Sequence, residues 1–303
     1  MTYEDLLKEL VTEDERYIVM TAENRAAIRN LPLILGNKFI DTGITEQTLI
    51  GSAAGLALTG RVPIVHALAS FLTMRAFEFI RTDVGIGNLP VKIIGGFPGL
   101  LSEANGPTHQ SIEDVSLMRG VPNVNVFCPA DNEDMLICLR KVFECPNPFY
   151  IRYNNFDSGI KHDENFEIGK AEIFSEGKDI AILVYGLLFK ETMIAKEILT
   201  NEGYSVKLVN IRTPKPIDEK VIIDSATSTK LLVTVEDHFL TGGLYSIVAE
   251  ICLRNRLNPD VLSIAFENKW FKPALLNDVL EYENMTGEKI ALRIKEKLSN
   301  KNG

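Results

Sequence analysis

The chain has 303 residues, 46% of them hydrophobic, and is long enough for two domains with a core each. Its 41 acidic and 32 basic residues give a net charge of -9 without a basic cluster, which argues against nucleic-acid binding. No run approaches the roughly 18 apolar residues that span a bilayer. The acidic, amphipathic start also lacks the pattern of a secretory signal, so we expect a cytoplasmic protein that does not enter the membrane.

Short apolar strands alternate with helical patterns in the first half of the chain. The strands are continuous or β-branched apolar runs, which are typical of buried parallel strands with helices on both faces. After an amphipathic opening helix, they are expected at residues 17–22, 38–44, 62–68, 91–96, 124–130 and 149–153. This alternation predicts a doubly wound α/β domain.

Between these strands lie three helical segments. A helix over residues 45–58 is rich in glycine and alanine, and each glycine costs roughly 1 kcal/mol relative to alanine. We therefore expect a close neighbour there, either the sheet or a partner subunit. An aromatic helix is expected over residues 70–85, and another over residues 131–145 with Asp131 as its cap.

Beyond about residue 155 the apolar periodicity gives way to turn residues, and then the α/β alternation restarts. We place a first domain at residues 1–160, a linker at 161–177 and a second, smaller α/β domain at 178–303. In the second domain, strands are expected within 179–186, 204–218, 231–238 and 261–268, and helices at 189–203, 242–256 and 287–299.

The four cysteines show no CxxC spacing, and most lie in strongly periodic segments. Buried reduced thiols are the usual explanation for that pattern. We expect no metal site built from this chain. The cysteines are Cys128, Cys138, Cys145 and Cys252.

Five motifs point to a family. They are GITEQ (43–47), SFLTMRAFEFIR (70–81), NGPTHQSIED (105–114), PNVNVFCPADNEDM (122–135) and VEDHFLTGGLYSIVAE (235–250). In this order and spacing they resemble the carboxy-terminal half of transketolase, and the resemblance covers nearly the whole chain. It implies a pyrimidine-binding domain followed by the transketolase carboxy-terminal domain, and an enzyme that transfers a two-carbon ketol unit from a ketose to an aldehyde.

The resemblance also implies a cofactor, thiamine diphosphate, and a metal ion, Mg²⁺ or Ca²⁺. Enzymes of this group hold the diphosphate and the metal through a separate domain that begins with Gly-Asp-Gly, and this sequence contains no Gly-Asp-Gly. We therefore expect a separate amino-terminal, diphosphate-binding subunit that holds most of the metal. Because the family builds its sites across a dimer interface, an α2β2 heterotetramer is expected.

Glu46 matches the family's catalytic glutamate. In such enzymes this residue hydrogen-bonds the ring nitrogen of the aminopyrimidine, a role that requires a carboxyl group that is protonated or shares its proton. A glutamate that merely stabilises a helix amino terminus, by about 0.3–1 kcal/mol, is the alternative.

Phe71, Met74 and Phe77 are spaced three apart on one face of the expected helix. They match the family's aromatic pocket around the aminopyrimidine, except that Met74 stands where an aromatic ring is usual. A thioether also packs on rings. A row of Phe and Met at this spacing is otherwise typical of a core.

His109 matches the histidine of the family's Gly-Pro-Thr-His-Gln turn, which lies near the hydroxyl and carbonyl groups of the donor. A neutral imidazole at that point can donate or accept protons as the carbon–carbon bond breaks and re-forms; a structural loop histidine is the alternative. Asn105 replaces an aspartate that reads an acceptor hydroxyl in the family. Phe97 replaces a histidine that contacts the substrate and its distal phosphate, which favours a less polar acceptor, such as a deoxy or non-phosphorylated sugar.

Four further residues are candidates for substrate binding. Arg152 matches a phosphate-binding arginine of the family, and a guanidinium suits bidentate phosphate contact; an ordinary ion pair is the alternative. Arg25 and Arg29 lie near the position of another phosphate-contacting arginine. His66 ends the strand at 62–68 and is expected beside the site or packed in the fold.

Three other functions remain open. The chain resembles, less closely, the beta subunit of a 2-oxoacid dehydrogenase and 1-deoxyxylulose-5-phosphate synthase. It is also compatible with a catalytically idle, structural subunit. Glu46 and His109 favour a transketolase, while Phe97 and Asn105 favour a dedicated step in making an unusual sugar.

Overall fold

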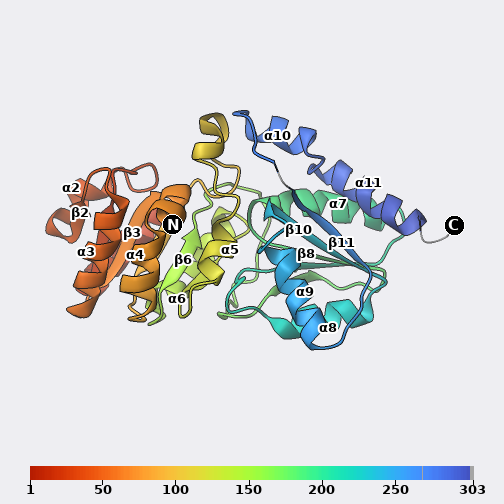
Figure 1. Cartoon of the computed structure of the whole chain (residues 1–303), viewed down its shortest axis with the longest axis horizontal. Helices are drawn as coiled ribbons and strands as arrows, with labels where there is room; N and C mark the ends of the chain where they lie inside the picture. The colour runs from red at the N-terminus through yellow and green to blue at the C-terminus, as the bar shows by residue number, and fades with distance from the viewer. Residues whose placement is uncertain (268, 301–303) are drawn as a thin grey trace.

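The chain folds into two α/β domains that lie side by side (Figure 1). The computed structural model describes residues 1–267 and 269–300. The first domain is built on a six-stranded sheet and the second on a five-stranded sheet. The α/β fold class expected from the sequence, with two doubly wound domains, is confirmed.

All strands of the first sheet run parallel, in the order β2-β1-β3-β4-β6-β5. Val19 of β1 pairs with Ile64 of β3, and both side chains are fully buried. Burial on both faces explains why these strands are almost continuously apolar. The strands are β1 (Tyr17–Thr21), β2 (Phe39–Asp41), β3 (Val62–Leu68), β4 (Lys92–Gly96), β5 (Asn125–Phe127) and β6 (Phe149–Arg152).

Helices of the first domain begin at capping residues where the sequence provides them. Thr2 and Asp5 exchange hydrogen bonds at the start of α1, and the Asp131 carboxylate accepts from the Asp134 amide at the start of α6. The helices are α1 (Tyr3–Glu13), α2 (Leu31–Leu35), α3 (Glu46–Leu58), α4 (Phe77–Phe79), α5 (Asp114–Arg119) and α6 (Asn132–Glu144), with short 3₁₀ turns η1 (Gly36–Lys38) and η4 (Glu103–Thr108).

The aromatic segment expected as one helix over residues 70–85 contains two π-helical turns. These are η2 (Phe71–Arg75), before α4, and η3 (Ile80–Gly85), after it. In η2 the amide of Ala76 donates to the carbonyl of Phe71, five residues back, at 3.1 Å. Each turn is therefore wider than in an α-helix, so residues spaced three apart no longer share one face.

The second sheet has the order β11-β10-β8-β9-β7. Its strands run parallel except β7, which pairs antiparallel with β9. β7 falls within residues 161–177, the segment expected as a linker. The strand expected over 261–268 ends at Phe266, and residue 268 lies outside the described residues. The strands are β7 (Glu172–Ser175), β8 (Ile180–Val184), β9 (Val206–Asn210), β10 (Leu231–Phe239) and β11 (Val261–Phe266).

Helices cover both faces of the second sheet. α7 packs with α11, and α8 with α9 (Figure 1). α8 and α10 were not expected from the sequence, and residues 301–303 of the expected domain lie outside the described residues. The helices are α7 (Phe189–Asn201), α8 (Glu219–Ser228), α9 (Leu244–Arg254), α10 (Leu276–Tyr282) and α11 (Gly287–Ser299), with a 3₁₀ turn η5 (Gly186–Leu188).

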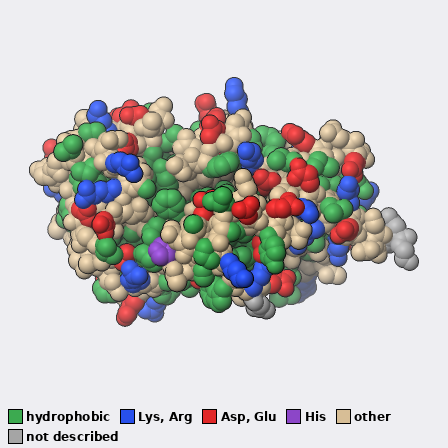
Figure 2. Space-filling model, turned by 90° about the horizontal axis from the view of Figure 1, so that it is seen from above, with side chains coloured by type: hydrophobic (Ala, Val, Ile, Leu, Met, Phe, Trp, Pro, Cys, Tyr) green, Lys and Arg blue, Asp and Glu red, His purple; other side chains and the backbone are tan. Residues whose placement is uncertain are grey.

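Acidic and basic side chains are interspersed over the face of the molecule shown in Figure 2. Within residues 1–267 and 269–300, no helix is long and apolar enough to cross a membrane. All four cysteines are free thiols, and three of them are buried.

Two buried charge clusters join the domains. In the first, Arg152 of β6 binds Asp114 of α5 and reaches across to Asp237 of β10, with nitrogen–oxygen distances of 2.9 and 2.6 Å. Tyr150 donates to Asp114 at 2.6 Å. Both carboxylates of this cluster are buried, so the guanidinium is their main source of positive charge.

The second cluster surrounds His162, which follows the first domain. Its two ring nitrogens lie 2.8 Å from a Glu172 carboxylate oxygen and 3.2 Å from an Asp131 oxygen. Burial alone would lower the pKa of His162, but hydrogen bonds to Asp131 and Glu172 raise it to about 10. Arg212 and Asp134 complete the cluster through a 2.6 Å ion pair. The ring is therefore an imidazolium at neutral pH, held between both domains.

Candidate active site

Glu46 is the first residue of α3, directly after the loop that leaves β2. Its side chain is 3% exposed, although an acidic residue in the first helical turn usually lies in solvent. One carboxylate oxygen accepts a hydrogen bond from the Arg75 guanidinium at 2.9 Å. A buried carboxylate with a single protein partner has acceptor capacity left for a ligand.

Arg75, at the end of η2, was not among the residues predicted for the site. Its side chain is 44% exposed, and its guanidinium carbon lies 4.1 Å from the centre of the Phe71 ring. Phe71 and Arg75 are four residues apart, close to one full π-helical turn, which brings both onto one side of η2. That four-residue spacing within the aromatic segment is the signal in the sequence that could have pointed to Arg75.

Phe71 also contacts His109. The two ring centres are 5.1 Å apart, with planes inclined at 60°, an edge-to-face arrangement. Glu46, Arg75, Phe71 and His109 therefore form one continuous string of contacts from three separate segments of the chain. The structure brings together the two residues predicted to be catalytic.

The other two members of the predicted aromatic row lie apart from this string. Met74 is 39% exposed, and Phe77 packs as a partly buried side chain against the core of the first domain. The π-helical turns explain this separation, because they rotate Met74 and Phe77 away from the face of Phe71. Contact of either side chain with a cofactor stays a prediction.

His109 ends the turn that contains η4. The Ser102 hydroxyl donates to the His109 carbonyl at 2.9 Å, and His109 Nδ1 lies 2.8 Å from the Thr108 hydroxyl. Gly106 has a φ of 69°, and a Cβ added there would lie 2.8 Å from Pro273, so the turn needs glycine. Asn105 is exposed on the same turn.

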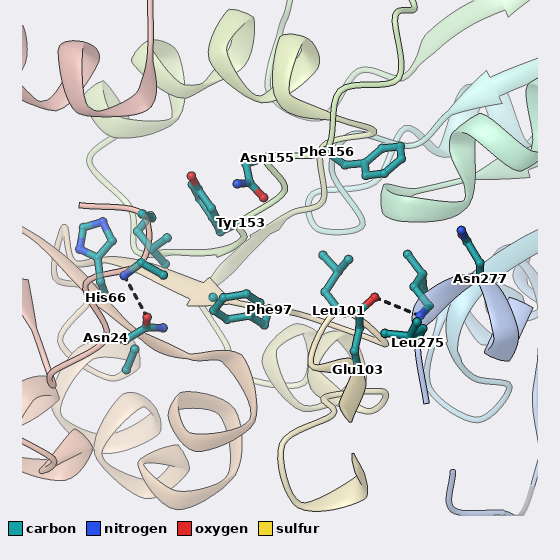
Figure 3. Close-up of a pocket in the computed structure, with 16 residues that line it drawn as sticks. Asn24, His66, Phe97, Leu101, Glu103, Tyr153, Asn155, Phe156, Leu275 and Asn277 are labelled. Atoms are coloured by element: carbon teal, nitrogen blue, oxygen red, sulfur yellow. Dashed lines mark hydrogen bonds between the residues drawn. The ribbon is translucent and has the colours of Figure 1, made fainter. Parts of the chain in front are cut away.

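A cavity of about 420 Å³ lies between the two domains beside this turn. Figure 3 shows Phe97, Leu101 and Glu103 of the turn segment facing it, with His66 on one side and Leu275 and Asn277 on the other. The Glu103 carboxylate accepts from the Leu276 amide at 3.0 Å, which ties the first domain to the first residue of α10. Phe97 is 42% exposed with a φ of 53°.

His66 lies in the wall of this cavity with both ring nitrogens engaged. Nδ1 lies 3.1 Å from the Met20 carbonyl, which can only accept, and Nε2 lies 2.8 Å from the Tyr3 hydroxyl, which donates to it. Burial lowers the pKa of His66 to about 4. His66 is therefore a neutral, fixed part of the wall.

The three predicted phosphate-binding arginines are not brought together. Arg152 is 3% exposed and occupied by Asp114 and Asp237, which indicates a structural contact in place of the expected substrate contact. Arg25 is exposed and pairs with Asp41. Arg29 is exposed and lines a neighbouring surface hollow.

One group of side chains among the described residues has the composition of a metal site. Asp134, His162 and Glu172 place one ligand atom each within 4.8 Å of one another. Each of these three side chains already has protein partners, because His162 lies between Asp131 and Glu172 and Arg212 pairs with both Asp134 and Glu172. The cluster is better described as a set of ion pairs between the domains.

Comparison with known proteins decides the family. The model for the pyrimidine binding domain of transketolase matches residues 1–156, and the model for the transketolase C-terminal domain matches residues 169–290. The chain belongs to the transketolase family. The resemblance proposed from the five sequence motifs is thereby confirmed.

Several members of the family have a similar length. The chain is 34% identical to a putative transketolase C-terminal section from Methanocaldococcus jannaschii, over 98% of this chain and 95% of that protein. It is 32% identical to the 6-deoxy-6-sulfo-D-fructose transketolase subunit SqwH of a Clostridium species, over 99% and 94%. A solved structure described as a split gene transketolase, inactive beta4 tetramer, superposes with a TM-score of 0.86 at 30% identity, over 98% of this chain and 96% of that one.

Longer relatives match over only part of their length. The 1-deoxy-D-xylulose-5-phosphate synthase of Dictyoglomus thermophilum is 35% identical over 85% of this chain, a match that spans 42% of the synthase. This transketolase-family chain therefore corresponds to a little under half of such an enzyme.

Proposed function

We propose that this chain is the pyrimidine-binding and carboxy-terminal subunit of a thiamine-diphosphate-dependent transketolase that is active only with a diphosphate-binding partner. The reaction would transfer a two-carbon ketol unit from a ketose to an aldehyde. The observation that carries the proposal is the buried carboxylate of Glu46, in one string of contacts with Phe71 and His109.

The residues at this site fit the pyrimidine half of the cofactor. Glu46 would hold a proton at the ring nitrogen, and Phe71 would pack against the ring face. His109 would exchange protons with the hydroxyl and carbonyl groups of the substrate. Thiamine diphosphate would supply the electron sink that lets the carbon–carbon bond break.

A partner chain is proposed for the other half of the cofactor. Relatives of nearly the same length are named as a C-terminal section, as a subunit and as a split gene product, and the last is described as inactive in its β4 form. These names support a second polypeptide that holds the diphosphate and most of the Mg²⁺ ligands. We propose an α2β2 heterotetramer, with the small-residue face of α3 near the shared interface.

An unusual sugar is the proposed substrate. Phe97 and Asn105 replace residues expected at an ordinary sugar-phosphate site, a histidine and an aspartate. A dedicated biosynthetic or degradative step therefore fits the chain better than the central pentose phosphate reactions.

The test is a thiamine diphosphate titration with Mg²⁺ on this chain alone and on the chain mixed with its diphosphate-binding partner. We expect only the mixture to bind the cofactor and to convert a ketose plus an aldehyde. The Glu46→Gln variant should bind but lose about 10²–10⁴-fold in kcat, because an amide cannot exchange the proton.

Glu133→Gln is the matched control, since Glu133 is an exposed glutamate in the first turn of α6 and should leave kcat unchanged. A mixture that binds no cofactor, or a fully active Glu46→Gln enzyme, would leave the structural-subunit alternative in its place. Formation of 1-deoxyxylulose 5-phosphate from pyruvate and glyceraldehyde 3-phosphate, without ketol transfer, would favour the synthase alternative.

A further inference from the structure

The cavity between the domains, about 420 Å³ in volume, falls within the usual size range of small-molecule sites. It is next to the proposed catalytic residues, because the same turn presents Phe97 to the cavity and His109 to Phe71. The Ser102 hydroxyl lies 3.4 Å from the Phe97 carbonyl and 2.9 Å from the His109 carbonyl, which holds the two ends of the turn together. His109 does not itself line the cavity, so a substrate at His109 would reach the cavity with its far end.

The charge of the cavity is unusual for a sugar-phosphate enzyme. None of its 16 lining residues, all within the described part of the chain, is a lysine or an arginine. The one histidine, His66, is neutral at pH 7 because its pKa is about 4. The one acidic residue, Glu103, adds a negative charge. A phosphate or sulfonate here would lose hydration and meet a carboxylate, while no side chain that lines the cavity is cationic. The Lys190 ammonium does not line the cavity but lies 5.0 Å from the centre of the Phe156 ring.

Apart from Glu103, the polar groups that line the cavity are neutral. The side chains of Asn155 and Asn277 and the Tyr153 hydroxyl make no hydrogen bond with any other described residue. Burial raises the pKa of Tyr153 to about 12, so its hydroxyl stays protonated. Amides and a phenol supply both donors and acceptors, which complement the hydroxyl groups of a sugar. Phe97 and Phe156 supply apolar surface for its carbon skeleton.

We propose that this cavity binds the distal end of an uncharged, polyhydroxylated aldehyde acceptor and discriminates against phosphorylated or sulfonated acceptors. The inference rests on the proposed ketol transfer and adds the substrate class. The three arginines predicted to bind phosphate do not line the cavity: Arg152 and Arg25 are paired with carboxylates, and Arg29 lines a neighbouring hollow that adjoins the cavity at Tyr153 and Asn155.

The test compares D-erythrose with D-erythrose 4-phosphate as acceptors for the reconstituted two-chain enzyme, with hydroxypyruvate as donor. The bond between the donor's carbonyl and carboxylate carbons breaks and CO₂ leaves. The remaining two-carbon unit then bonds to the acceptor's aldehyde carbon, whose oxygen takes up a proton, so one proton is consumed per turnover. We expect kcat/KM to be at least tenfold higher for erythrose.

Asn155→Arg places a cation at the cavity and should move the ratio of the two kcat/KM values at least tenfold toward the phosphate. Asn258→Arg is the matched control, because Asn258 is exposed before β11 and does not line the cavity. It should leave the ratio unchanged. Glu103→Gln removes the cavity's carboxylate and should improve use of erythrose 4-phosphate several-fold, while use of erythrose changes little.

Three results would overturn the inference while ketol transfer stands. These are a preference for erythrose 4-phosphate, a ratio that Asn155→Arg does not move, and a selective loss of erythrose 4-phosphate use in Arg29→Gln. Absence of both CO₂ release and product with either acceptor, in an enzyme that binds the cofactor, would instead overturn the proposed function and the inference with it.

Discussion

Two arginines of the first domain, Arg152 and Arg75, each bind a buried carboxylate, but they do so in opposite settings. Arg152 is 3% exposed and has Asp114 and Asp237 as partners. Arg75 is 44% exposed, with Glu46 as its carboxylate partner and the Phe71 ring beneath it. The Arg152 cluster is closed on all sides by protein. The Arg75 pair is open on the side where a ligand would approach.

The comparison separates structure from function among residues of the same type. Arg152 looked like a phosphate ligand from its sequence context, yet its donors are consumed by carboxylates from both domains. Arg75 was not predicted to be part of the site, yet it contacts Glu46, the glutamate on which the proposed chemistry depends. The partner and the exposure of a charged side chain indicate its role better than its identity does.

Substitution of Arg152, in the buried cluster with Asp114 and Asp237, should destabilise the protein more than substitution of Arg75. Arg152→Met leaves two buried carboxylates without their cation, and we expect the free energy of unfolding, measured in urea, to fall by about 3–5 kcal/mol. Adding Asp237→Asn removes one of those charges, so the double variant should cost less than the sum of the single ones. Full additivity, or a loss below about 1 kcal/mol, would show that Arg152 does not hold the domains together.

Most of the fold was predictable from local pattern, because buried parallel strands need apolar runs that are visible in the sequence. β7 and α8 were not. β7 is a short edge strand that carries Glu172, a buried acid whose partners His162 and Arg212 come from outside the strand. α8 contains valine, isoleucine, serine and threonine, which have modest helix propensity, and its cap Asp218 lies in a segment that reads as a loop.

Single residues of the candidate site could be predicted from the sequence, but the contacts among them could not. Glu46, Phe71 and His109 were identified from motifs; Phe71 contacts His109 directly, and Glu46 is linked to Phe71 through Arg75. The position of Arg75 over Phe71 depends on a π-helical turn, and the spacing of apolar residues in the sequence does not predict such a turn. The Arg152 guanidinium is engaged in part by Asp237, which lies 85 residues away in the sequence. Local sequence does not specify such long-range pairs.

His162 offers a second way to test the closed regions, through pH. Its pKa of about 10 lies above the ordinary value near 6.5, so its stabilising contribution is complete below about pH 6.5 and is lost as the pH rises through 10. His162→Gln should therefore cost about 2–3 kcal/mol in urea unfolding at pH 6.5 and less than about 1 kcal/mol near pH 10.

His238, another buried histidine at the domain contact, is the control for this pH dependence. Its Nε2 accepts from the Ser116 amide at 3.2 Å, and burial lowers its pKa to about 4. A lowered pKa makes stability fall between pH 6.5 and 4 and leaves the alkaline range unaffected. The cost of His238→Gln should thus stay constant from pH 6.5 to 10. If His162→Gln behaves the same way, His162 is not charged in the folded protein.

The open pair should show the smallest stability effect and a different kind of response. Arg75 covers the face of Phe71 and binds the carboxylate of Glu46. In the proposed site the pyrimidine ring needs both of these contacts. The guanidinium must therefore move when the cofactor binds. Arg75→Gln should change the free energy of unfolding by less than about 1 kcal/mol, and should tighten thiamine diphosphate binding by the two-chain enzyme about threefold to tenfold, measured by calorimetry.

Arg16→Gln, which breaks the exposed pair with Asp14, should cost as little stability and leave cofactor affinity unchanged. Weaker cofactor binding by Arg75→Gln would mean that Arg75 stays in place and helps to hold the cofactor, and the open pair would then be part of the binding site.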